Sequence, residues 1–273
     1  MRIKAFGRAA ACFICLFGLL FASACAAAGP AVVQPSSSAQ IETAFETLSS
    51  ASPDETTFVT PPASETPTSD TTVESETPAP SYRNLSPLSS EHYMPSFEEL
   101  SYERSEPVEY IMLHFSSNVL GKPEDPYNIE DMVGVYAGWE SSTNYVIDRE
   151  GNIYCFVPEY RCAWHAGKGA WKDDERLTDK MNFYSVGIEL LAIGSQKDMS
   201  IYMSSRQYKK IPQEYIGYTD AQYEALSALL DDLCAEYSIP ADRDHIIGHE
   251  EYAPDRKNDP GELFDWQRVV PTV

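Results

Sequence analysis

Polar residues that can bind a metal gather near the end of the sequence. The stretch GHEEYAPDRKNDPG, residues 248–261, contains His249 and Asp259 among several other charged side chains. Runs of mixed charge are commonly solvated loops, but an imidazole and a carboxylate that a loop brings together are two ligands for one zinc ion. Two ligands do not complete a zinc site, so another part of the chain must supply a third.

A second histidine, His245, lies four residues before His249. On a helix this spacing would place both imidazoles on one metal ion. The intervening residues Ile246, Ile247 and Gly248 favour a strand, in which four residues span about 13 Å. We therefore expect a structural role for His245, and we expect His249 to lie at a strand end, where loops build sites.

The residues around these histidines predict alternating strands and helices. Apolar and β-branched runs favour strands, and apolar residues at helical spacing favour a helix, with Asn128 and the Thr219/Gln222 capping box as N-terminal signals. Pro240 should close the second helix. The expected strands are EYIMLHFSS (109–117, with His114 near its end), a hairpin over NYVIDREGNIYCFV (144–157), SVGIELLAIG (185–194) and HIIGH (245–249), and the expected helices cover 128–140 and 219–240. This alternation predicts an α/β domain with one central sheet.

The start of the chain predicts export. MRIKAFGR is basic and precedes the apolar run AAACFICLFGLLFASAC, and together they resemble a secretory signal over residues 1–24. An uncleaved membrane anchor is the alternative, because the apolar stretch could just span a bilayer. The small residues that end at Cys25 resemble a bacterial lipoprotein processing site, which predicts either a lipid anchor on Cys25 or ordinary cleavage in the same patch.

Composition separates a tether from a domain. Residues 25–95 are rich in Ser, Thr, Pro, Ala and Glu and contain too few large apolar side chains to offset the entropy of ordering, which predicts a disordered tether. The remaining residues, 96–273, fit one globular domain.

Charge and cysteine content narrow the class of protein. The chain has 42 acidic and 20 basic residues, a net charge of −22, and without a basic stripe we expect no nucleic-acid partner. Three cysteines, Cys155, Cys162 and Cys234, lie in the predicted domain, and an odd set does not make a disulfide framework. Cys155 and Cys162 could face each other across a hairpin, but we favour buried free thiols.

Four motifs together resemble a known enzyme family. IMLHFSS, STNYVIDREGNIYCFVPEYRCAWHAGKG, SVGIEL and IIGHEEYAPDRKNDPGELFDW, in this order, are similar to the zinc-dependent N-acetylmuramoyl-L-alanine amidases. That family includes the bacteriophage T7 lysozyme, the AmpD amidases and the animal peptidoglycan-recognition proteins. The resemblance implies a single α/β domain with a central mixed β-sheet flanked by helices.

The resemblance also implies a role for particular residues. The zinc ligands would be His114, His249 and Asp259, where the Asp places the chain with the AmpD-like branch. Glu189 would be the general base and Lys257 the stabiliser of the oxyanion. Trp164, His165 and Asn144 would contact the substrate. The chain departs from the phage pattern at Thr143, where the phage enzyme has a catalytic tyrosine, so a tyrosine-assisted mechanism is not expected.

The chemistry of these residue types agrees with the implied roles. Three ligands leave one open position on a tetrahedral zinc ion, whose water becomes acidic enough to ionise near pH 7. A carboxylate is then needed to move a proton, and a cation is needed to meet the charge that develops on the carbonyl oxygen.

The sequence therefore predicts an exported, monomeric amidase with one Zn²⁺. It would act outside the cell or in the cell wall on the amide between N-acetylmuramic acid and L-alanine of bacterial peptidoglycan. Two alternatives remain open: a non-catalytic module that binds peptidoglycan, and a zinc peptidase that cuts the stem peptide.

Overall fold

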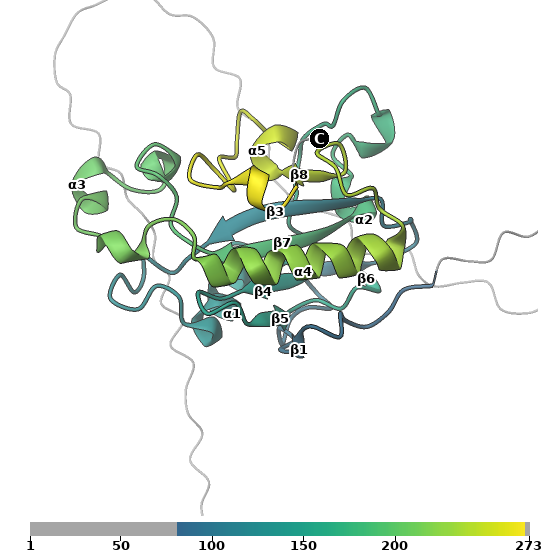
Figure 1. Cartoon of the computed structure of the whole chain (residues 1–273), viewed down its shortest axis with the longest axis horizontal. Helices are drawn as coiled ribbons and strands as arrows, with labels where there is room; N and C mark the ends of the chain where they lie inside the picture. Colours follow the sequence, from purple (N-terminus) through teal and green to yellow (C-terminus); the bar gives the residue numbers. More distant parts are fainter. Residues whose placement is uncertain (1–80, 271–273) are drawn as a thin grey trace, which may run out of the picture. The chain divides into compact units, whose positions relative to one another are not determined.

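A mixed six-stranded sheet organises the chain in the computed structural model, which describes residues 81–270 (Figure 1). The strands lie in the order β1-β5-β4-β7-β3-β8, and β2 and β6 form a separate antiparallel pair. The strands are β1 (Ser90–Glu91), β2 (Ser101–Glu103), β3 (Tyr110–Ser116), β4 (Tyr145–Ile147), β5 (Ile153–Cys155), β6 (Arg161–Ala163), β7 (Ser185–Leu191) and β8 (Ile246–Gly248). The predicted α/β fold with a central mixed sheet is confirmed.

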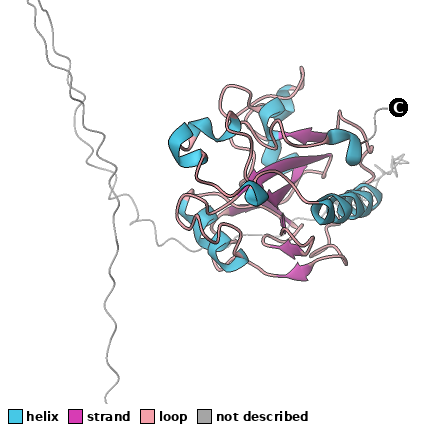
Figure 2. Cartoon of the chain, turned by 60° about the vertical axis from the view of Figure 1, so that its left-hand side comes forward, coloured by secondary structure: helices cyan, strands magenta, loops and turns pink. Residues whose placement is uncertain are grey.

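Helices cover both faces of the sheet (Figure 2). The helices are α1 (Ile129–Gly138), α2 (Met181–Tyr184), α3 (Ser205–Tyr208), α4 (Asp220–Tyr237) and α5 (His249–Tyr252), and short 3-10 turns cover Glu175–Leu177, Asp198–Ile201, Gln213–Tyr215 and Trp266–Arg268. The long helix α4 packs on one face, and α1 packs on the opposite face.

The alternation of side chains along β7 determines which face holds the chemistry. Val186, Ile188 and Leu190 belong to the hydrophobic cluster that includes α4. Because successive side chains of a strand point to opposite faces, Gly187 and Glu189 lie on the other face. The face away from α4 is therefore the one that can carry a polar site.

Both predicted helix starts are confirmed. The Asn128 side chain accepts hydrogen bonds from the first backbone N–H groups of α1. Thr219 and Gln222 form the reciprocal capping box at the start of α4. The Gln222 amide also donates to the carbonyl oxygens of Ile147 (3.3 Å) and Leu191 (3.0 Å), so the cap fixes α4 to two strands of the sheet.

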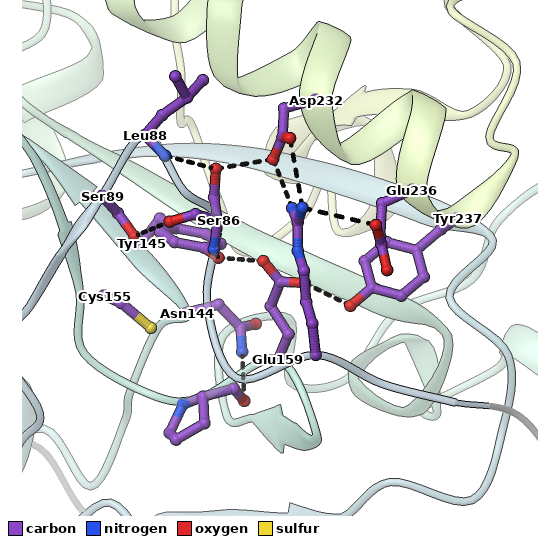
Figure 3. A network of polar contacts seen from close by, with 12 residues as sticks. Ser86, Leu88, Ser89, Asn144, Tyr145, Cys155, Glu159, Asp232, Glu236 and Tyr237 are labelled. Atoms are coloured by element: carbon purple, nitrogen blue, oxygen red, sulfur yellow. Dashed lines mark hydrogen bonds and ion pairs between the residues drawn. The ribbon is translucent and has the colours of Figure 1, made fainter.

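The domain begins before the predicted boundary at Ser96. β1 pairs with β5, and Met94 is fully buried in the cluster around α1. Arg83 binds Asp232 of α4 through two hydrogen bonds of 2.5 and 3.2 Å (Figure 3). The predicted tether thus ends at the latest near Ser81, while the signal peptide, Cys25 and residues 25–80 lie outside the described residues.

The cysteines of the described region are free, as favoured from the sequence. Cys155 lies on β5, which pairs with β1 and β4, whereas Cys162 lies on β6, which pairs with β2. The two thiols therefore do not face each other across a hairpin. No helix among residues 81–270 has the length and apolar character needed to cross a membrane.

Candidate metal centre

Three adjacent parallel strands place the predicted site residues side by side. In the register of the sheet, His114 of β3 lies beside Glu189 of β7, and Leu113 lies beside Gly248, the last residue of β8. His249 follows directly after β8 and starts α5. Ligand sites in open sheets form at the carboxyl ends of such strands, and this sheet follows that rule.

Asp259 completes a compact group with the two histidines. Its Oδ2 lies 2.7 Å from Nδ1 of His114 and 3.1 Å from Nδ1 of His249. The three side chains are buried, and one donor atom from each lies within 4.8 Å of the others. The structure thus brings together the three predicted zinc ligands.

The loop that carries Asp259 is held at both ends. The backbone N–H of Glu250 donates to the Asp259 carbonyl oxygen at 2.9 Å. The buried Asp198 accepts the N–H of Glu262 at 3.2 Å through its side chain, and its carbonyl accepts from the Asn258 amide at 3.0 Å. A loop fixed on both sides of Asp259 presents the carboxylate in one position.

The hydrogen bonds of His249 test whether the group suits a cation. Its Nε2 lies 2.8 Å from the carbonyl oxygen of Ala166, which only accepts, so Nε2 carries a proton. In the neutral ring, which is the form that binds metals, Nδ1 presents a lone pair toward the Asp259 carboxylate. Two acceptors at 3.1 Å repel each other unless a cation lies between them, and imidazole with carboxylate is a donor set that zinc accepts.

Electrostatics keep His114 available as a ligand. Burial lowers the pKa of His114 to about 4, so the imidazole is neutral at neutral pH. A neutral imidazole is the form that binds metals.

Glu189 and Lys257 line the same pocket as the three ligands. The Oε2 atom of Glu189 is buried without a hydrogen-bond partner. Burial, together with the negative charge of Asp259, raises the pKa of Glu189 to about 8, although Ser116 and Lys257 act in the opposite direction. A carboxyl group with a pKa near neutrality is suited to accepting and returning a proton.

Several other lining residues had no role assigned from the sequence. Ser116 of β3, whose hydroxyl lies 2.7 Å from that of Tyr136, lies next to Glu189. Trp139, at the end of α1, and Tyr202, which lies between the SVGIEL motif and the motif that begins IIGHEE, also line it. No motif identified this part of the chain, so only the fold shows that it contributes to the site.

Two of the predicted substrate contacts do not line the pocket. Asn144 is fully buried, and its amide binds backbone: Nδ2 donates to the Val157 carbonyl at 3.1 Å, and Oδ1 accepts from Gly187 N at 3.1 Å. Trp164 is not among the lining residues and packs against Tyr102, with ring centroids 5.2 Å apart. Asn144 thus lies outside the pocket with its amide bonded to backbone groups, and neither Asn144 nor Trp164 lines the pocket.

The remaining polar residues have structural contacts. His165 lines the pocket but is only 8% exposed, and its Nδ1 lies 3.1 Å from Nε2 of His114. Thr143 donates to the Gly187 carbonyl at 2.9 Å. His245 lies outside the ligand group, and its Nδ1 lies 2.7 Å from Asp242, as expected for a structural histidine.

Comparison with protein families matches residues 104–262 to the N-acetylmuramoyl-L-alanine amidase family. The chain belongs to this family. The resemblance predicted from the four motifs is therefore confirmed over more than half of the chain, including all three candidate ligands.

Individual amidases are similar over a shorter stretch. The 1,6-anhydro-N-acetylmuramyl-L-alanine amidase AmpD of Salmonella typhimurium (strain SL1344) is 38% identical over 127 residues, which cover 46% of this chain and 54% of AmpD. The N-acetylmuramoyl-L-alanine amidase AmiD of Escherichia coli (strain K12) is 37% identical over 118 residues, 43% of this chain and 37% of AmiD. The matched region thus spans about half the length of AmpD and less of AmiD.

A solved structure supports the fold of this amidase-family chain. The crystal structure of a selenomethionine AmpD derivative aligns with a TM-score of 0.50 and 24% sequence identity, and it covers 67% of this chain and 93% of that one. At this identity the likeness concerns the fold alone.

Proposed function

We propose that this protein is an exported zinc-dependent amidase that hydrolyses the amide between N-acetylmuramic acid and L-alanine in peptidoglycan. Membership of the amidase family and the named activities of AmpD and AmiD support the reaction class. The observation that carries the proposal is the convergence of His114, His249 and Asp259, with Glu189 and Lys257 in the same pocket.

The chain's own residues supply the acid–base chemistry. A zinc ion held by the two histidines and Asp259 would supply a Lewis acid at one end of the pocket. Glu189 takes a proton from the attacking water and returns it to the amine of the departing L-alanine. Lys257 offers a positive charge to the carbonyl oxygen as negative charge develops there.

The pocket also offers apolar surface to a large substrate. Leu120, Trp139 and Tyr202 line it, and their exposed fractions are 54%, 69% and 37%. Exposed aromatic side chains provide flat apolar faces with a polar edge, which suits the packing of a sugar ring. We assign recognition of the muropeptide to these residues in place of Asn144.

The test is digestion of purified peptidoglycan by the purified zinc-loaded protein. Mass spectrometry should identify peptides that begin with L-alanine and glycan strands without peptide. A chelator should abolish these products, and added zinc should restore them. Cleavage within the stem peptide would instead identify a zinc peptidase, and binding without new termini would identify a binding module.

Export and anchoring form the second part of the proposal. The apolar leader supports export, and Cys25 supports attachment to a membrane at the cell surface. Fractionation of cells that produce the wild-type protein or Cys25→Ser tests this. If Cys25 is lipidated, the wild-type protein should be found in the membrane fraction and the variant in the medium. An unchanged distribution would contradict a lipid anchor on Cys25.

We propose that the protein is a monomer, which sedimentation of the purified protein tests.

A further inference from the structure

The short loop that follows β6 contacts both histidine ligands. The carbonyl oxygen of Ala166 lies against Nε2 of His249, and the ring of His165 lies against Nε2 of His114. Both backbone N–H groups of this loop donate to the Asn182 side chain, at 3.1 and 2.8 Å. One loop segment, fixed by one amide, therefore touches the outer nitrogen of each ligand.

We propose that His165 is a positioning residue for the metal centre. It accepts a hydrogen bond from Nε2–H of His114 and thereby holds His114 in the tautomer whose Nδ1 lone pair faces Asp259. The sequence suggested a substrate contact for His165, so the proposal changes its assignment. It rests on the zinc site of the proposed function.

The direction of each hydrogen bond follows from the Met181 carbonyl, which ends the series of contacts from His114 through His165 and Ser185. Ser185 Oγ lies 2.7 Å from the Met181 carbonyl oxygen, which can only accept, so the serine proton is used there. Ser185 Oγ must then accept from His165 Nε2, which lies 3.1 Å away and therefore carries a proton.

The other nitrogen of His165 is consequently an acceptor. A ring protonated on both nitrogens would be a buried cation without a carboxylate partner among its hydrogen bonds, which is costly. In the neutral ring Nδ1 has a lone pair, so His114 Nε2, at 3.1 Å, must donate to it. His114 Nδ1 is then bare and lies 2.7 Å from Asp259 Oδ2, a second acceptor pair that a cation would separate.

Gly187 shows that the fold makes room for this ring. A Cβ atom at Gly187 would lie 2.5 Å from Cγ of His165, closer than real contacts allow. The ring therefore lies directly on the backbone of β7. A side chain packed in this way is restricted in orientation, which a positioning role requires and a substrate contact does not.

The two histidine ligands are thus oriented by different means. His249 is fixed by a backbone carbonyl, which no substitution removes, and Arg256 binds the same carbonyl at 2.6 Å. The Nε2 atom of His114 is held by the His165 side chain, and the hydroxyl of Ser185 in turn holds His165. The contribution of the partners of His114 can therefore be measured by mutation.

The experiment measures zinc affinity of the full-length protein by competition with a chelator, without peptidoglycan. His165→Leu removes the acceptor and should weaken zinc binding by about 10–100-fold, as other partners of ligating histidines do. His165→Asn places an amide oxygen near the former Nδ1 and should restore part of the loss. His245→Leu, the same change at a histidine outside the site, should leave zinc affinity unchanged.

A spectroscopic measurement separates positioning from simple loss of fold. Long-range ¹H–¹⁵N correlation spectra of the zinc-loaded protein should show the Nε2–H tautomer for both His114 and His165. Ser185→Ala removes the acceptor for His165 Nε2–H and should weaken zinc binding less than His165→Leu does. This second variant keeps the proposal testable if His165→Leu does not fold.

Two results would overturn the assignment. If His165→Leu or Ser185→Ala folds, keeps wild-type zinc affinity and only raises KM, His165 is a substrate contact. If His114 carries its proton on Nδ1, its Nε2 cannot donate to His165, and His165 does not hold His114 in the proposed tautomer. Failure of wild-type protein to bind zinc would instead refute the proposed function, so the two failures are distinguishable.

Discussion

Two buried carboxylates in this domain have opposite surroundings. The carboxylate of Glu159 is fully buried, and each of its side-chain partners is an N–H or O–H group that donates to it. These partners are Arg83 Nε at 2.7 Å and the hydroxyl groups of Tyr145 and Tyr237 (Figure 3). Asp259, 7% exposed, faces the Nδ1 atoms of two histidines, whose Nε2 atoms are bonded elsewhere. Both clusters join segments that are distant in the sequence, but only the first is complete without a further group.

The difference shows how a structural carboxylate can be told from a metal ligand. A charge surrounded by donors has its hydrogen-bonding capacity filled and is neutralised by its own protein partner. A charge surrounded by acceptors requires a cation. Counting the protons of each cluster therefore assigns Glu159 to stability and Asp259 to chemistry, although both are buried acids.

The largest expected effect on the cluster of His114, His249 and Asp259 comes from removing one of these side chains. His249→Ala removes one of the three proposed zinc ligands, so bound zinc and amidase activity should both disappear, because the ligand and the Lewis acid are lost together. Zinc content by atomic absorption and product formation from peptidoglycan check this. Stoichiometric zinc in the variant would show that the ion binds elsewhere.

Glu189→Gln should separate the base from the ligands. The amide keeps the shape of the side chain but cannot accept a proton, so kcat should fall by about 10²–10⁴-fold. Bound zinc should stay near stoichiometric, and KM should change little because the lost interaction belongs to the transition state. Turnover close to wild type would exclude Glu189 as the base, and loss of zinc would make it a ligand.

Arg83→Met tests the structural role of the cluster formed by Glu159 with Arg83, Tyr145 and Tyr237. It leaves Glu159 buried without its cation, so the free energy of unfolding should fall by about 3 kcal/mol. Lys122→Met, which breaks the exposed ion pair with Asp131, is the matched control and should cost less than about 1 kcal/mol. Urea unfolding of both variants measures the difference, and equal losses would refute the structural assignment of Glu159.

Local signals account for what the sequence predicted well. Capping residues and strand alternation depend on neighbours in the chain, and together with the order of the motifs they located β3, β7, α4 and the three candidate ligands. The boundary at Ser96 was wrong because residues 81–95 share the polar composition of the predicted tether. Their order comes from partners far along the chain, such as the bond between Arg83 and Asp232.

Side-chain direction explains what the sequence did not show within the site. Asn144 and His165 belong to matched motifs, but the sequence does not show that the Asn144 amide bonds to backbone and that the His165 ring lies against His114. Tyr202 was missed because its segment matches no motif and reaches the pocket only through the fold. These features depend on tertiary contacts, which spacing along the sequence does not encode.

The smallest expected effect concerns Asp232, which binds Arg83 at the edge of the Glu159 cluster, and the pH dependence of its contribution to stability. Burial raises the pKa of Asp232, but hydrogen bonds from Arg83 and Ser86 outweigh this and leave that pKa below its ordinary value. A carboxyl group whose pKa is lower in the folded state stabilises the fold above its unfolded pKa, and this contribution is lost as pH falls below about 4. Asp232→Asn lacks the contribution at every pH.

The stability difference between wild type and Asp232→Asn should therefore be about 1 kcal/mol or less at pH 7 and should shrink on acidification. Urea unfolding at pH 7 and pH 3 measures it, and because both proteins keep the same metal cluster, loss of zinc in acid affects them alike. A difference that stays constant or grows toward low pH would show that the bond between Arg83 and Asp232 does not stabilise the fold through charge.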